Sequence, residues 1–152
     1  AFIIMDFFEE KLLGEAVILF LFTPLIAAMA GNVGVQSSAI IVQGLANDDV
    51  KGSINNRLIK EMLLATLNGV ILSIVLFLFV YAWQSDLKLA LAISVSLVAV
   101  VIIAGLVGTF IPLFLDRRDI DPAIATGPFI TTSNDIFGIV IYLIISKFIL
   151  GV

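Results

Sequence analysis

The spacing of the charged residues constrains this chain most. Residues 16–45, 62–85 and 89–115 contain no Asp, Glu, Lys or Arg, and residues 122–146 contain only Asp135. Each stretch exceeds the roughly 20 residues that an α-helix needs to cross the hydrocarbon of a bilayer. Inside a membrane, only helices and closed barrels satisfy every backbone polar group. The sequence therefore predicts an all-α membrane protein, a polytopic helical bundle with four full spans.

Composition agrees with this prediction. Of the 152 residues, 61% are hydrophobic and 13% are charged, whereas a soluble domain normally carries about 25% charged residues. We expect the spans at about residues 16–44, 58–83, 89–115 and 128–150. Residues 1–15 start with an apolar run, expected to be the end of a fifth, N-terminal helix, and continue as an amphipathic segment at the membrane surface.

The basic residues orient the predicted spans. Five of the eight Lys and Arg residues fall in the predicted loops at 46–60 and 116–127. Cytoplasmic loops of membrane proteins carry an excess of Lys and Arg. We therefore expect these two loops to face the cytoplasm, with the chain in the inner (cytoplasmic) membrane of the cell.

Composition also limits the chemistry. The chain contains no Cys and no His, which removes the usual protein ligands of zinc, copper and iron and the commonest general base. A net charge of −4 without a basic patch argues against nucleic-acid binding. The remaining oxygen ligands suit hard cations such as Mg²⁺, Ca²⁺ or Na⁺. We do not expect an enzyme: an intramembrane aspartyl protease would need a glycine-flanked catalytic aspartate, which is missing.

Asp135 lies near the middle of the last predicted span, roughly 15 to 20 Å from either end at 1.5 Å per residue. An aspartate at that depth costs several kcal/mol if it faces lipid, and the apolar stretches of the spans hold no Lys or Arg that is available to pair with it. Asp135 must therefore face protein, water or a cation. The alternative to an ion or proton site is a protonated Asp135 that bonds to a neighbouring span.

Helical counting places small and hydroxylated residues on the same face of the span as Asp135. They are Pro128, Thr131, Thr132, Gly138 and Tyr142. This composition is typical of a pore lining.

A second polar stretch follows Pro24 in the first predicted span. Glycines there lower helix stability by about 1 kcal/mol each relative to Ala. Bare backbone or a broken helix inside a membrane is tolerated only where it lines a cavity or is buried in protein. The residues expected to supply oxygens opposite Asp135 are Gly31, Asn32, Gly34, Gln36 and Ser37. The alternative is tight helix packing with hydrogen bonds between helices.

Two further sets of small residues favour close helix contact. The third span carries Ala104, Gly105 and Gly108, a spacing typical of helix packing in membranes. The second span has a similar set, Asn68, Gly69 and Ser73.

Three motifs together carry a family resemblance. In order, "PLIAAMAGNVGVQSSAIIVQGLA", "KEM" at 60–62 and "DPAIATGPFITTSNDIFGIVIYL" resemble the membrane domain of the MgtE family of magnesium channels. Those channels are homodimers with five transmembrane helices per subunit and an ion path along the dimer interface. The resemblance implies that residues 16–152 form the ion-conducting domain and that residues 1–5 end the family's first helix. It leaves no counterpart in this chain for the family's cytosolic regulatory portion.

The resemblance also implies roles for individual residues. Asp135 matches the aspartate that holds hydrated Mg²⁺ in the pore, Gly31 and Asn32 match a glycine and an asparagine of the second family helix, and Asp121 and Pro122 match the Asp-Pro pair that opens the last helix. The implied ion site comprises Asp135, Gly31, Asn32, Thr131, Thr132 and Gly138. Further pore or gate candidates are Gly34, Gln36, Gly127 and Asp121.

Three positions depart from the family's pattern. Val33 and Val35 stand where polar side chains are often found, and Gly127 stands where Asn can occur. At these positions only backbone oxygens remain as ligands.

Together with these observations, the resemblance implies a Mg²⁺-selective channel or passive transporter that works as a homodimer in the lipid membrane, with two copies of Asp135 across a two-fold axis. Mg²⁺ gives up its waters reluctantly, so one or two carboxylates and outer-shell oxygens suffice. Oxygen ligands also accept Mn²⁺, Ca²⁺ and Co²⁺ to some degree. The alternatives are an H⁺- or Na⁺-coupled secondary transporter, which would need a second ion gradient, and a purely structural membrane protein.

Overall fold

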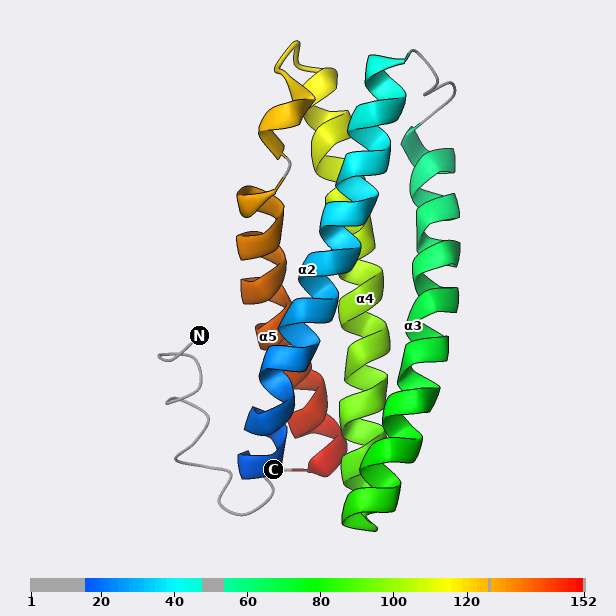
Figure 1. The fold of residues 1–152 in the computed structure, drawn as a ribbon, viewed down its shortest axis with the longest axis vertical. Helices are drawn as coiled ribbons and strands as arrows, with labels where there is room; N and C mark the ends of the chain where they lie inside the picture. Colours follow the sequence, from blue (N-terminus) through cyan, green and yellow to red (C-terminus); the bar gives the residue numbers. More distant parts are fainter. Residues whose placement is uncertain (1–15, 48–53, 126, 152) are drawn as a thin grey trace.

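The computed structural model describes residues 16–47, 54–125 and 127–151, and the statements below concern these residues. The expected end of an N-terminal helix and the amphipathic segment at 1–15 lie outside them. Four long helices make up the fold (Figure 1), with a short 3₁₀ helix, η1, before the last. Their bounds are α2 (Ala16–Ala46), α3 (Ile54–Gln84), α4 (Leu87–Asp116), η1 (Pro122–Ala125) and α5 (Pro128–Leu150).

All four helices are long and apolar enough to cross a membrane, with mean hydropathies between 1.7 and 2.8. The predicted all-α bundle with four full spans is confirmed. The largest difference from the expected bounds is at the start of α3, which begins at Ile54 rather than at residue 58. Polar residues at a helix end can continue the helix beyond the hydrocarbon, so charge marks the membrane boundary better than the helix boundary.

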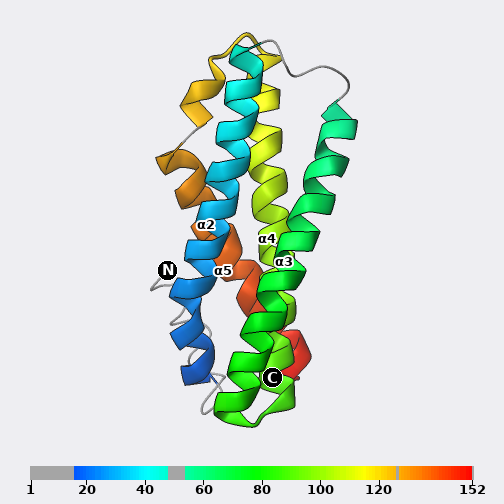
Figure 2. The same ribbon diagram turned by 45° about the vertical axis from the view of Figure 1, so that its right-hand side comes forward.

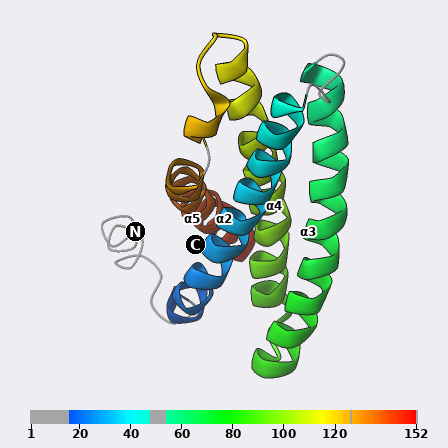
Figure 3. The same cartoon turned by 45° about the horizontal axis from the view of Figure 1, so that its top comes forward.

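Helix α4 is the centre of the bundle. It packs against α2, α3 and α5, and α2 also packs against α5, whereas α3 packs along α4 (Figure 1 and Figure 2). The ends of α2 and α4 and the start of α3 lie at the same end of the bundle (Figure 3). The helix ends that border the two predicted loops therefore lie on one side of the fold, as the basic residues predict. That this side is cytoplasmic stays a prediction.

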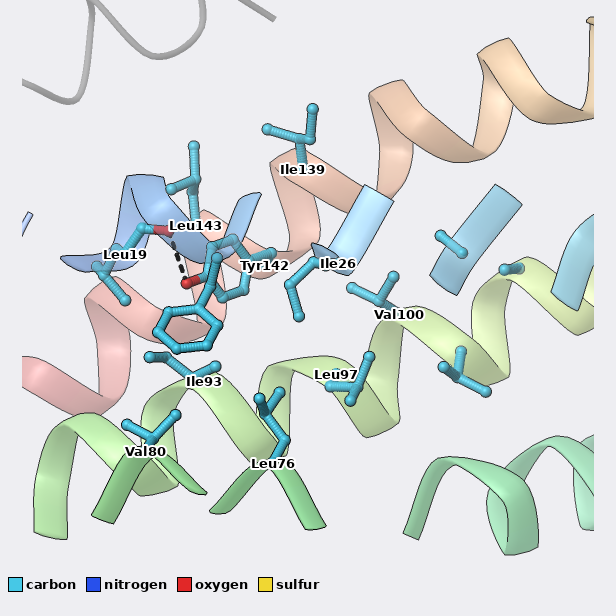
Figure 4. Packing of buried hydrophobic residues seen from close by; sticks show 14 of the residues in the cluster. Leu19, Ile26, Leu76, Val80, Ile93, Leu97, Val100, Ile139, Tyr142 and Leu143 are labelled. Carbon is cyan, nitrogen blue, oxygen red and sulfur yellow. Dashed lines mark hydrogen bonds between the residues drawn. The ribbon is translucent and has the colours of Figure 1, made fainter. Parts of the chain in front are cut away.

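Polar side chains connect the helices inside the apolar core. The buried Tyr142 of α5 donates a hydrogen bond to the Leu19 carbonyl of α2 at 3.0 Å (Figure 4). Ser73 of α3 donates to the Ser94 carbonyl of α4 at 2.7 Å. Lipid tails are as apolar as leucine, so such bonds and close packing replace hydrophobic exclusion as the forces between helices.

The closest helix contact joins α2 and α4 through two glycines. A Cβ atom on Gly108 would lie 2.3 Å from the Gly34 carbonyl oxygen and 3.0 Å from its Cα. The predicted packing role of Gly108 is confirmed. Gly69 faces Val98 and Val101 of α4 with more room, because a Cβ there would meet atoms at 3.4 to 3.5 Å. Asn68, one residue and about 100° earlier on the helix, is exposed instead.

We expect Gly108→Ala to destabilise the protein by about 1–3 kcal/mol, because the new methyl group meets backbone that no rotamer change can move. Gly69→Ala is the matched control. It adds the same methyl group in ordinary contact and should leave stability unchanged or raise it by up to about 1 kcal/mol through helix propensity. Thermal unfolding of the purified protein in detergent measures both. Equal Tm values for the two variants would contradict this description of the α2–α4 contact.

Candidate functional site

A groove of about 510 Å³ runs along α2 and is bordered by α5. Eight of its lining residues come from α2 and two from α5. They are Pro24, Ala27, Ala28, Gly31, Asn32, Val35, Gln36, Ala39, Thr131 and Asp135. The α2 residues recur every three or four positions, so they form one face of a single helix.

Helix α2 is unbroken from Ala16 to Ala46, with Pro24 inside it. Of the two possibilities for the polar stretch, a broken helix or a continuous helix with exposed backbone at its glycines, the structure shows the continuous helix. Packing against α4 and α5 outweighs the low helix propensity of the glycines, as tertiary contacts commonly do. Because most backbone carbonyls of an intact helix accept hydrogen bonds from the next turn, the groove must offer mainly side-chain oxygens.

Asp135 and Gly31 meet across the groove wall. A Cβ on Gly31 would lie 3.5 Å from Asp135 Oδ1 and 3.5 Å from the Thr131 methyl group. The missing side chain thus lets the carboxylate of α5 lie against the backbone of α2. Asp135 is half-buried, and no hydrogen bond or ion pair to it is found among the described residues. It is an unpaired carboxylate inside a membrane span, facing an open groove.

The other polar lining side chains come from the same two helices. Asn32 and Gln36 are exposed on the groove face of α2. Thr131 donates its hydroxyl to the Gly127 carbonyl at 3.1 Å, which leaves the lone pairs of the hydroxyl oxygen free to accept. Four of the expected site residues, Gly31, Asn32, Thr131 and Gln36, are thus brought to the same groove as Asp135.

The two valines that depart from the family's pattern differ in position. Val35 lines the groove, so this position contributes an apolar side chain to it. Val33 instead points toward α4, where its Cγ1 would lie 3.6 Å from a Cβ on Gly105.

Two expected site residues face the protein interior. A Cβ on Gly138 would lie 3.2 Å from Ala30 and 3.2 Å from Val100, so Gly138 belongs to the contact of α5 with α2 and α4. Gly34 packs against α4 and α5. Helix α5 crosses behind α2 (Figure 1), so the face that carries Asp135 passes into the core one to two turns later. The same crossing carries Tyr142 to Leu19.

Three more candidates lie outside the groove lining. Thr132 is exposed, about 100° around α5 from Thr131. Gly127 is the N-cap residue of α5 with φ +61°, and its carbonyl accepts from the Thr131 backbone N–H at 3.0 Å. Asp121 is exposed, and its Oδ1 accepts from the Ala123 backbone N–H at 2.9 Å, a local turn before η1. These contacts give Gly127 and Asp121 roles at the start of α5 rather than in the groove.

Sequence reasoning missed Asn134. Its side chain is 1% exposed, and neither amide atom has a hydrogen-bond partner in the described structure. The amide occupies the space left by Gly34, since a Cβ there would lie 1.7 Å from Asn134 Nδ2. An Asn directly before Asp135 in an apolar span was the available signal, but its glycine neighbour on another helix was not visible in the sequence.

Ser37 also differs from expectation. It is buried on the far side of α2 from the groove and donates a hydrogen bond to Glu61 of α3. It therefore does not supply an oxygen opposite Asp135.

Comparison with known proteins supports the resemblance carried by the motifs. The family model MgtE, described as a divalent cation transporter, matches residues 23–145, which include both walls of the groove. Proteins named magnesium transporter MgtE from Enterococcus faecalis, Bacillus subtilis and Thermus thermophilus are 38%, 35% and 34% identical over 134, 140 and 142 residues.

These alignments cover 88%, 91% and 93% of this chain and 30%, 31% and 31% of the relatives. The chain thus spans less than a third of the length of the curated relatives it matches. The match covers most of the chain and includes the groove, and the chain therefore belongs to the MgtE family of divalent cation transporters.

Proposed function

We propose that this chain forms the ion path of a Mg²⁺-selective channel or passive transporter, in which the cation moves along the groove beside Asp135. The unpaired, half-buried Asp135 carboxylate is the observation that carries this proposal. A carboxylate inside a membrane needs a compensating charge or water. Residues 122–146 contain no Lys or Arg, and the one basic residue of α5, Lys147, lies in its last turn, about three turns from Asp135. A passing hydrated cation is then the compensating charge.

The groove suits a hydrated ion. Mg²⁺ keeps most of its six octahedral waters when it binds proteins, and six waters at about 30 Å³ each fill about 180 Å³. The groove, at about 510 Å³, has room for an ion of this size. The side chains of Asn32, Gln36 and Thr131 would accept hydrogen bonds from its waters while Asp135 supplies the charge. Oxygen ligands of this kind also accept Mn²⁺, Ca²⁺ and Co²⁺ to some degree.

A second copy of the chain would complete the path. Asn32 and Gln36 are exposed at the groove, and amides that face lipid without a partner are costly. Pro24, Ala28 and Ala39 are also exposed on this face, and small residues let helix backbones approach closely. A two-fold homodimer in the cytoplasmic membrane would cover both grooves and place the two Asp135 carboxylates on opposite sides of one path.

The expected result of Asp135→Asn is loss of Mg²⁺ entry. In liposomes without a proton or sodium gradient, we expect the wild-type protein to admit Mg²⁺ and Asp135→Asn to reduce the entry rate about tenfold or more, because the amide keeps the volume and removes the charge that offsets the cation's desolvation. A Mg²⁺-sensitive dye inside the liposomes measures entry. Asp116→Asn, an exposed aspartate at the end of α4, is the matched control and should leave entry unchanged.

Two outcomes would contradict this function. Entry that begins only when a proton or sodium gradient is imposed would indicate the coupled transporter. Entry that is unaffected by Asp135→Asn would show that the groove carboxylate does not serve the ion.

Cysteine cross-linking tests the dimer. The chain has no cysteine, so one introduced residue reports without background. Ala28→Cys lies on the groove face of α2, and Val75→Cys lies on α3, on the other side of α4. With a short bifunctional maleimide in native membranes, we expect Ala28→Cys to give a covalent dimer on gels and Val75→Cys to stay monomeric. The reverse pattern would place the interface on α3.

A further inference from the structure

Glu61 is an acidic residue near the start of α3 that turns toward the bundle. Its carboxylate accepts a hydrogen bond from the hydroxyl of Ser37 on α2. Its neighbours Lys60 and Met62 are exposed, whereas Glu61 is half-buried and Ser37 is 4% exposed. No Lys or Arg within the described ranges forms an ion pair with Glu61, so the contact with Ser37 is the polar interaction that holds the carboxylate there.

This hydrogen bond joins two helices that otherwise pack on a third. Helices α2 and α3 each pack along α4, and the Glu61 side chain reaches across α4 at Gly105. A Cβ on Gly105 would lie 3.2 Å from Glu61 Oε1 and 3.2 Å from the Ala65 side chain. The absence of a side chain at Gly105 therefore leaves the passage through which Glu61 reaches Ser37.

The bond acts on the helix that forms most of the groove. Ser37 directly follows Gln36, which lines the groove, and points to the opposite side of α2. A hydrogen bond on that side resists rotation of α2 about its own axis, because neighbouring residues of a helix are separated by about 100°. If the bond between Ser37 and Glu61 were lost, α2 could rotate about its axis. Such a rotation would carry Asn32 and Gln36 away from Asp135.

Side-chain hydrogen bonds hold α2 at two points, one before the groove residues and one near their far end. Tyr142 bonds to the Leu19 carbonyl on one side of the groove residues, and Glu61 bonds to Ser37 near the other end. The lining residues of α2 fall between positions 24 and 39. A hydrogen bond from a hydroxyl to a carboxylate is stronger than one to a neutral acceptor. A strong bond suits this position, because α2 and α3 share little other contact.

We propose that Glu61 is a positioning residue for ion passage: through Ser37 it sets the rotation of α2 that presents Asn32 and Gln36 to the groove. This proposal rests on the proposed function of the groove. It assigns Glu61 no contact with the ion.

The test uses four variants in the liposome assay, Glu61→Ala, Ser37→Ala, their double variant and Glu61→Gln, and measures Mg²⁺ and Ca²⁺ entry per folded protein. We expect Glu61→Ala and Ser37→Ala each to lower Mg²⁺ entry and the Mg²⁺:Ca²⁺ entry ratio about five- to tenfold, the effect of losing one hydrogen bond of this type. The double variant should lose no more than either single variant, because both remove the same bond. Glu61→Gln should stay within about twofold of wild type, since its amide oxygen still accepts from Ser37.

Three results would overturn the proposal. If Glu61→Gln is as impaired as Glu61→Ala, the negative charge matters and Glu61 attracts the cation instead. If the two single losses multiply in the double variant, the residues act independently. An unchanged Mg²⁺:Ca²⁺ ratio in Ser37→Ala would also overturn it, and this variant removes only one hydroxyl, so it keeps the test decisive even if Glu61→Ala fails to fold.

Failure of the underlying function would look different. In that case the wild-type protein would admit no Mg²⁺ without a second gradient, or Asp135→Asn would leave entry unchanged. Failure of the positioning role alone would leave wild-type entry and its dependence on Asp135 intact.

Discussion

The contact between the backbones of α2 and α4 is the constraint on which the rest of this structure depends. Gly34 and Gly108 meet where neither helix has a side chain, and Asn134 of α5 fills the remaining space beside Gly34. Three helices are thus joined at one level of the bundle. Because Asn134 is fixed there, the next residue, Asp135, is held at the groove edge beside Gly31. Gly31 and Gly34 of α2 therefore serve different parts of the fold: Gly34 packs in the core, and Gly31 borders the groove.

Asn134 and Asp135 show how two adjacent polar residues are divided between core and groove. An amide without a partner costs about 1–3 kcal/mol when buried, a penalty that close packing against Gly34 can offset. A carboxylate in the same place would cost far more, because the ionised group loses its hydration. The neutral side chain is accordingly the one in the core, and the charged one keeps an open side toward the groove. This division leaves the carboxyl group of Asp135 open toward the groove.

The continuity of α2 changes what the groove can offer. A broken helix would present several free carbonyl oxygens to an ion, as the discontinuous helices of many secondary transporters do. An intact helix with a polar face presents side-chain amides at intervals of about one turn, which suits hydrogen bonding to the waters of a hydrated ion rather than their replacement. In this respect the geometry of Asn32 and Gln36 agrees with the slow dehydration of Mg²⁺.

The amino-acid sequence was sufficient to place the four spans, to single out Asp135 and to name the stretch of α2 that faces it. These inferences depend on local composition, because charges and bare backbone are excluded from lipid wherever the chain folds. Helical periodicity gives the angles between residues on one helix, but not the angle at which two helices cross or the neighbour that each face meets. The crossing of α5 behind α2 carries Gly138 and Tyr142 into the core, and the passage at Gly105 lets Glu61 reach Ser37. These contacts depend on close packing among three helices that are far apart in the sequence. Only the tertiary structure therefore decides which neighbour each side chain meets.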